Sequence, residues 1–288
     1  MDDVELMALY WTVSGPVDVH YGREWSTFEW SARCEQAAKV GFAGIGLWHA
    51  DIEHQLETRT LQEIKRTFDD AGLKHLQLEF IDDFFVEQGS AARRASDRRR
   101  KQLLDAAAVL APLHVKVGNI PGTAAELGRV IESFNELCAE AAQHGVDIVY
   151  EPMPFDVNVN TLDAMVAFAE GIDADNGGVA IDVWHMSKMA IAPAALRALP
   201  ADRLTWVELS DGLFADRDDR IDETINHRRL PGEGEFDNPG YVAACAEIGY
   251  AGPWGVEVLS AELRALPIEQ EFQRAYESTR AQFGAAVA

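Results

Sequence analysis

The chain has 288 residues, of which 48% are hydrophobic, and a formal net charge of −23 at pH 7. This acidic balance argues against nucleic acid or an anionic membrane surface as a partner, because proteins that bind them carry basic patches. No stretch approaches the roughly 20 consecutive apolar residues that cross a bilayer. The N-terminal stretch opens with acids instead of the basic residues of a secretory signal, so we expect a cytoplasmic protein.

Eight short apolar runs predict strands, in chain order at residues 6–12, 44–50, 75–81, 114–119, 147–153, 179–184, 204–210 and 254–260. Amphipathic stretches with apolar residues at i, i+3 and i+4 lie between them, at residues 27–41, 61–72, 125–145, 161–172 and 238–250. Eight strand–helix units predict a single (β/α)8 TIM barrel in one domain, residues 1–288. The long loop 211–237 follows the seventh strand, where long loops tend to carry function.

Four acidic residues stand in the carboxyl-terminal parts of the last four predicted strands. They occur in the runs IVYEPMP (Glu151), VAIDVWH (Asp182), TWVELSD (Glu208) and WGVEVLS (Glu257). A carboxylate among apolar residues is costly unless a positive group meets it, and four converging carboxylates repel one another. A divalent cation is the simplest partner, so the pattern predicts a metal site.

The ligand types narrow the choice of metal. Oxygen ligands favour Mg²⁺ or Mn²⁺, whereas a nitrogen from His185 or His227 would favour Mn²⁺, Co²⁺ or Zn²⁺. For each carboxylate taken alone, an ion pair or a helix cap at a strand end explains it equally well. The metal hypothesis therefore depends on all four residues together.

Several motifs resemble those of the xylose-isomerase-like TIM barrel superfamily, the sugar phosphate isomerase/epimerase group whose relatives include inosose dehydratase, dehydroshikimate dehydratase and endonuclease IV. The motifs are the pair Glu151–Pro152, the D-x-x-H of Asp182 and His185, the V-x-L-x-D of 207–211, the PGEGEFD of 231–237, and Glu257. The resemblance implies that Glu151, Asp182 and Glu257 bind the metal and that His185 contacts substrate.

Glu208 departs from the pattern of the sugar epimerases, which usually have His at this place. We interpret Glu208 as a fourth metal ligand. The alternative is that Glu208 points at substrate while His227 or water completes the coordination. An extra carboxylate would hold a divalent ion firmly while weakening its Lewis acidity.

A divalent ion bound to a carbonyl and a neighbouring hydroxyl of a small carbohydrate or polyol would acidify the adjacent C–H and stabilise an enediolate. Glu151 and Glu257 would flank the substrate as catalytic residues, and His185 would serve as an acid if a hydroxyl group leaves. Proton transfer by the glutamates would give a keto-sugar isomerase or epimerase. The alternative is a lyase that dehydrates an inosose, a dehydroshikimate or a 3-keto-glycoside-like substrate. A nuclease is disfavoured by the net charge and by only eight histidines, and a binding module has little use for this carboxylate set.

Other residues near strand ends are candidates for substrate contacts. Lys116, Glu79, His49 and Arg229, the last preferred over Arg228, could each bind substrate or serve only in a structural ion pair. The tryptophans Trp11, Trp48 and Trp184 would suit the face of a sugar ring or belong to the core. The acidic GEGEFD loop disfavours a phosphate site, so we expect an unphosphorylated substrate. Homo-oligomer formation is left open.

Overall fold

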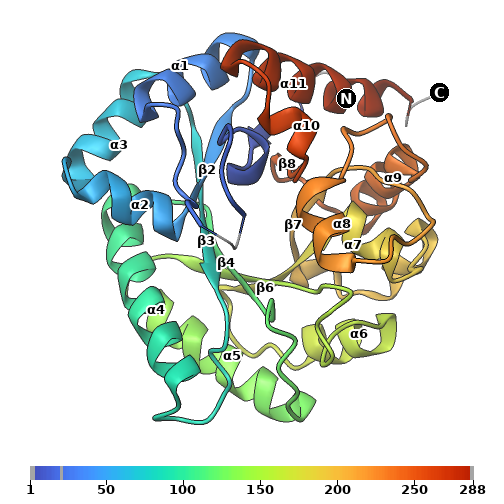
Figure 1. Cartoon of the computed structure of the whole chain (residues 1–288). Coiled ribbons are helices and arrows are strands. Elements are labelled where there is room, and N and C mark those ends of the chain that lie inside the picture. The colour runs from blue at the N-terminus through green and yellow to red at the C-terminus, as the bar shows by residue number, and fades with distance from the viewer. Residues whose placement is uncertain (1–3, 20–21, 286–288) are drawn as a thin grey trace.

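The structure, a computed structural model, describes residues 4–19 and 22–285, so Asp2 and Asp3 of the acidic N-terminal stretch lie outside it. Eight parallel strands close into a barrel in the order β1 to β8 (Figure 1). Their bounds are β1 Leu6–Ala8, β2 Gly44–Trp48, β3 His75–Ile81, β4 His114–Gly118, β5 Asp147–Glu151, β6 Gly177–Asp182, β7 Leu204–Leu209 and β8 Trp254–Val256. The predicted TIM barrel is confirmed.

Helices surround the barrel, and shorter helices form part of the loops that follow the strands (Figure 1). They are α1 Trp30–Val40, α2 His49–Leu56, α3 Leu61–Asp70, α4 Ala91–Leu110, α5 Leu127–Ala142, α6 Leu162–Glu170, α7 Val183–Lys188, α8 Arg220–Asn226, α9 Asn238–Ile248, α10 Ala261–Arg264 and α11 Ile268–Ala285. Short 3-10 helices lie at Tyr10–Thr12, Pro193–Ala198 and Ala201–Arg203. Within the described residues, no helix is both long and apolar enough to span a membrane.

Several strands end earlier than their apolar runs predict. The first ends at Ala8, and residues 10–12 form a 3-10 helix instead of strand. The sixth ends at Asp182 because the side chain of Asp182 accepts hydrogen bonds from the backbone N–H groups of Trp184 and His185 and so caps α7. Asp182 is thus both the last residue of β6 and the N-cap residue of α7.

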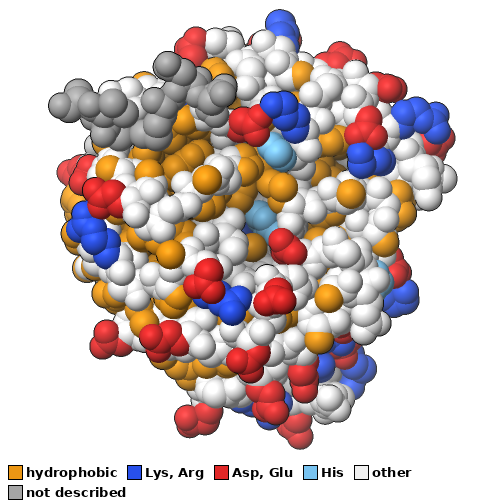
Figure 2. Space-filling view, turned by 180° about the vertical axis from the view of Figure 1, so that it is seen from behind, with side chains coloured by type: hydrophobic (Ala, Val, Ile, Leu, Met, Phe, Trp, Pro, Cys, Tyr) orange, Lys and Arg blue, Asp and Glu red, His pale blue; other side chains and the backbone are white. Residues whose placement is uncertain are grey.

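Basic and acidic side chains are interspersed on the surface. On the face shown in Figure 2, Lys and Arg side chains are scattered among acidic ones instead of forming a stripe. The helix α4 carries six basic side chains, and several of them pair with acids: Arg93 lies 2.8 Å from Asp97, Lys101 lies 2.6 Å from Asp105, and Arg99 lies 2.5 Å from Asp82, which precedes the helix. Ion pairs therefore neutralise part of this basic face of α4.

Alternation along the strands places the polar residues inside the barrel. Side chains two apart on a strand share a face, so each inward carboxylate or Lys follows another inward residue. The pairs are Gln77 and Glu79 on β3, His114 and Lys116 on β4, Val149 and Glu151 on β5, Ala180 and Asp182 on β6, and Trp206 and Glu208 on β7. Met7, Leu9, Val149, Ala180 and Trp206 form a buried apolar cluster beneath the charged layer.

One glycine makes room for this layer. Gly255 on β8 is the register partner of Glu208 on β7. A Cβ at Gly255 would lie 2.8 Å from the Trp206 ring and 3.1 Å from Glu208 Cγ. Only a residue without a side chain fits there, and its absence lets two large inward side chains share the barrel axis.

Candidate metal centre

Four carboxyl groups converge at the carboxyl end of the barrel. Glu151, Asp182 and Glu208 come from the ends of β5, β6 and β7, and Glu257 directly follows β8. One oxygen from each lies within 4.8 Å of the corresponding oxygen of the others, and each residue is at most 3% exposed. The structure thus brings together the four residues that the sequence analysis singled out.

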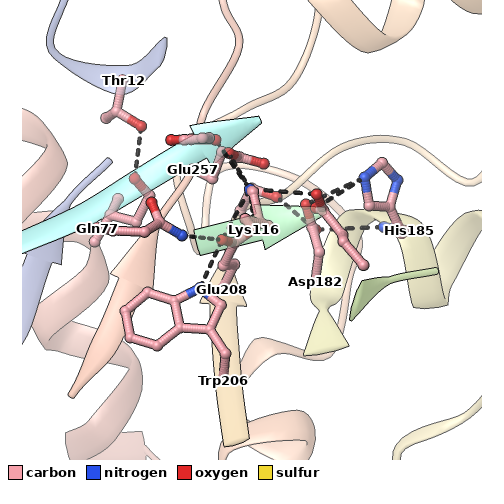
Figure 3. A network of polar contacts seen from close by, with 12 residues as sticks. Thr12, Gln77, Lys116, Asp182, His185, Trp206, Glu208 and Glu257 are labelled. Atoms are coloured by element: carbon pink, nitrogen blue, oxygen red, sulfur yellow. Dashed lines mark hydrogen bonds and ion pairs between the residues drawn. The ribbon is translucent and has the colours of Figure 1, made fainter. Parts of the chain in front are cut away.

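Supporting side chains that the sequence analysis did not identify hold two of these glutamates. Glu208 Oε1 accepts hydrogen bonds from Trp206 Nε1 at 2.6 Å and from Gln77 Nε2 at 3.2 Å (Figure 3). The Thr12 hydroxyl donates to the carbonyl of Val256 at 2.6 Å and accepts from the N–H of Val258 at 2.7 Å. Thr12 therefore fixes the backbone on both sides of Glu257. A polar Gln77 within an apolar strand was the one available signal.

Two cationic side chains lie against the carboxyl groups. Lys116 Nζ lies at the centre of the cluster, 2.7 Å from Glu257 Oε1 and 3.0 Å from Glu208 Oε1 (Figure 3). Arg228 Nη1 donates to Asp182 Oδ2 at 2.7 Å and lies 3.6 Å from Glu257 Oε2. Both cations are buried, so their pairings are strong but carry a large desolvation cost.

Burial and crowding change the protonation of the cluster. Burial raises the pKa of Glu79 and Glu208 well above the usual range and raises the pKa of Glu151 to about 7. Burial alone would lower the pKa of Lys116, but the neighbouring carboxylates raise it well above its ordinary value. Lys116 is therefore an ammonium cation, and Glu79, Glu151 and Glu208 around it hold a proton more readily than exposed glutamates do.

His185 adjoins the carboxylates on the side of α7. Its Nε2 lies 3.3 Å from Glu151 Oε1 and 3.5 Å from Asp182 Oδ2, and these three residues form a second, smaller group of candidate metal donors. Burial lowers the pKa of His185 to about 4 although Asp182 opposes this effect. The imidazole is thus neutral near pH 7 and can donate or accept a hydrogen bond.

A pocket lies over the carboxyl cluster, and only some of the candidate site residues line it. Charged or polar lining residues are Glu79, Lys116, Glu151, His185, Thr224, Arg228 and Glu257, and the remainder are apolar or aromatic: Trp11, Trp48, Phe80, Ile120, Met153, Phe155, Ile225 and Leu259. Asp182 and Glu208 do not line this pocket. Glu151 and Glu257 therefore face the pocket, while the other two carboxylates lie behind them.

Three other candidates lie outside the pocket. His227 is exposed, and its Nε2 lies 3.0 Å from Asp222 Oδ2. His49 is half-buried and packs its ring on Trp48 with ring centroids 4.5 Å apart. Trp184 packs beneath Arg228, whose guanidinium carbon lies 4.9 Å from the ring centroid.

The positions of Arg228 and Arg229 are the reverse of what the sequence analysis preferred. Asp211 and Arg229 form an antiparallel bridge, with backbone N–H to carbonyl distances of 2.7 and 2.8 Å. The side chain of Arg228 is buried, whereas that of Arg229 is exposed. The residue that reaches over the cluster is therefore Arg228.

The residues present suit a divalent cation. Within the described residues, five buried carboxyl groups, counting Glu79, have two cationic partners, Lys116 and Arg228, and Glu151 Oε1 accepts no hydrogen bond. A cation added here would offset the excess of carboxyl groups, and carboxylate oxygens are the ligands that Mg²⁺ and Mn²⁺ prefer.

The fold and the site define the class of this protein. It is a TIM barrel with a pocket lined by carboxyl groups at the carboxyl end of its strands, which is where enzymes of this fold have their active sites. The chain belongs to the xylose isomerase-like TIM barrel family, whose model matches residues 34–282.

Relatives in this family are enzymes of more than one kind. The chain is 25% identical to a 3-dehydroshikimate dehydratase of Pseudomonas aeruginosa over 82% of its own length, but spans only 37% of that protein. It is 23% identical to an L-ribulose 3-epimerase of Methylomonas sp., covering 86% of this chain and 87% of the epimerase. Among solved structures, the IOLI protein with a bound zinc atom superposes with a TM-score of 0.77 at 18% identity, covering 98% of this chain and 99% of that one.

Proposed function

We propose that this protein is a divalent-metal-dependent isomerase or epimerase of a keto sugar or related polyol. The observation that carries the proposal is that Glu151 and Glu257 both open into one pocket, with Lys116, Arg228 and the neutral His185 beside them. The relatives named as an epimerase and a dehydratase support a reaction on a small polyhydroxylated molecule.

Glu151, Asp182, Glu208 and Glu257 would hold the ion, which we propose to be Mn²⁺ or Mg²⁺ because all four donors are oxygens, with Co²⁺ or Zn²⁺ as alternatives. When bound, such an ion polarises a carbonyl group and stabilises the negative charge that forms next to it.

The protein's own residues would move the protons. Glu257 removes the proton from the carbon next to the carbonyl group, and Glu151 returns a proton from the other side of the pocket. Return of the proton to the opposite face of the same carbon gives an epimer. Its return to the former carbonyl carbon, while the proton of the neighbouring hydroxyl passes to the former carbonyl oxygen, gives an aldose–ketose isomer. His185 positions a substrate hydroxyl by a hydrogen bond, because its imidazole is neutral.

The apolar wall of the pocket would bind the carbon side of the substrate. Trp11 and Trp48 line it with ring centroids 4.7 Å apart, and Phe80 lies beside Trp48. Flat apolar surfaces of this kind pack against the C–H face of a sugar or cyclitol ring, which leaves the hydroxyl edge for the charged residues below.

A dehydratase is the second candidate, favoured by the match to a 3-dehydroshikimate dehydratase. Removal of the same proton by Glu257 would then be followed by loss of a neighbouring hydroxyl group as water. Glu151 is suited to protonate that hydroxyl, because burial raises its pKa to about 7.

Deuterium exchange separates these reactions. The protein loaded with Mn²⁺ is incubated in D₂O with a panel of keto sugars and inososes, and the products are examined by NMR and mass spectrometry. We expect one carbon-bound hydrogen to exchange in a product with the formula of the substrate. Loss of water would favour the dehydratase instead. If folded, metal-loaded protein exchanged no hydrogen in any member of the panel, the proposed reaction class would be wrong.

A further inference from the structure

A lysine is not needed to bind a metal ion, yet the ammonium group of Lys116 lies among the candidate metal ligands. Its Nζ contacts carboxyl oxygens of four residues. The distances are 2.7 Å to Glu257 and 3.0 Å to Glu208 (Figure 3), and 3.3 Å to both Glu151 and Glu79. The ammonium group is therefore a cation surrounded by carboxyl oxygens, which is the environment that a metal ion would occupy.

Three of the four contacted residues, Glu151, Glu208 and Glu257, belong to the candidate metal group. The fourth member of that group, Asp182, is paired with Arg228. Each of the four candidate ligands is therefore already engaged by a cationic side chain. A divalent ion must share these oxygens with Lys116 or displace it, and two cations within a few ångströms repel one another strongly at low dielectric.

Glu79 can serve as the ion-pair partner of Lys116 when a metal ion binds. Lys116 and Glu79 are register partners on β4 and β3, so their backbones are fixed side by side. Glu79 is not a member of the four-residue group, and within the described residues its Oε1 accepts no hydrogen bond. The ammonium group can therefore move towards Glu79 without losing all of its carboxylate partners.

We propose that Lys116 is an internal counter-ion that competes with the divalent ion for the carboxylates and shifts onto Glu79 when the ion binds. The inference rests on the metal site of the proposed function and adds a second state to it. In the metal-free state Lys116 balances the buried carboxylates and keeps the barrel intact. In the metal-bound state Lys116 is left at the pocket wall, where substrate oxygens arrive. The competition lowers the affinity for the ion and makes the site exchangeable.

The test is a titration of metal-free protein with Mn²⁺ by calorimetry, without any substrate. Lys116→Met removes the charge but keeps much of the side-chain volume. We expect this variant to bind Mn²⁺ at least about tenfold more tightly than the unaltered protein, equivalent to about 1.4 kcal/mol. Lys116→Gln, which removes the charge but keeps hydrogen-bond donors, should behave in the same way.

Lys188→Met is the matched control. The side chain of Lys188 is also only 5% exposed, but it pairs with Glu223 at 2.6 Å and contacts none of the four candidate ligands. Its loss should leave the Mn²⁺ affinity nearly unchanged, which separates direct competition from a general change in charge.

The unaltered, metal-free protein should stay folded, whereas the Lys116 variants should depend on Mn²⁺ and lose thermal stability when a chelator is added. Unchanged or weaker Mn²⁺ binding by both variants would overturn the proposal. Binding by the variants but not by the unaltered protein would support the competition and contradict metal dependence of the proposed reaction. The deuterium-exchange assay tests that reaction independently, because it measures substrate chemistry.

Discussion

Replacing Glu257 with Gln is expected to lower kcat/KM by at least roughly 10²–10⁴-fold, the usual contribution of a positioned acid or base. The substitution removes both a candidate metal ligand and the group proposed to take the substrate proton. Its effect on stability should be small, because Gln has nearly the same shape and its carbonyl oxygen can still accept the hydrogen bond from Lys116. Turnover and melting temperature are measured on the same preparation.

Glu262→Gln is the control for this change. Glu262 follows Glu257 closely in the chain but is exposed and lies outside the pocket. The control should keep normal turnover. If Glu257→Gln also kept the turnover of the unaltered protein, a proton-transferring ligand at this position would be ruled out.

His185→Ala is expected to reduce turnover by roughly 10²–10⁴-fold while leaving the metal content nearly unchanged. The reason is geometric: Asp182 is directed into the carboxyl cluster, whereas His185, three residues later, lines the pocket. Metal content by elemental analysis, melting temperature and kcat together separate the roles.

The outcomes for His185 are distinct. Loss of metal would make His185 a ligand, through the group that it forms with Glu151 and Asp182. A large drop in stability with little change in rate would make it structural. His227→Ala is the control, since His227 is exposed and paired with Asp222, and both rate and metal content should be unaffected.

The strand-end carboxylates could be predicted from the sequence because two simple regularities place them. Parallel strands of a barrel all end at one rim, and alternation along each strand turns every second side chain inward. An acid near the end of each of four successive apolar runs must then approach the others. Glu151, Asp182 and Glu208 follow this logic, and Glu257 lies one residue beyond its strand.

Residues from outside the strands could not be predicted in the same way. Arg228 reaches the site through a loop whose path depends on tertiary contacts, since the Asp211 carboxylate accepts backbone hydrogen bonds from Gly232 and Phe236. Nothing in the spacing of the sequence indicates that this loop turns Arg228 inward and Arg229 outward.

The pairing of Lys116 with four glutamates also depends on tertiary structure. A lone lysine on an apolar strand is compatible with a substrate contact or with an ion pair, and the sequence alone does not decide between them. The side chain of Lys116 points into the barrel from β4, and closure of the barrel brings its ammonium group to the centre of the cluster.

The most direct test of the account is a crystal structure of the protein grown with Mn²⁺, measured for anomalous scattering at the manganese edge. We expect one peak among Glu151, Asp182, Glu208 and Glu257, with oxygens about 2.0–2.6 Å away, and the Lys116 ammonium shifted towards Glu79. The absence of a peak at saturating Mn²⁺, with Lys116 still between Glu208 and Glu257, would contradict the metal centre.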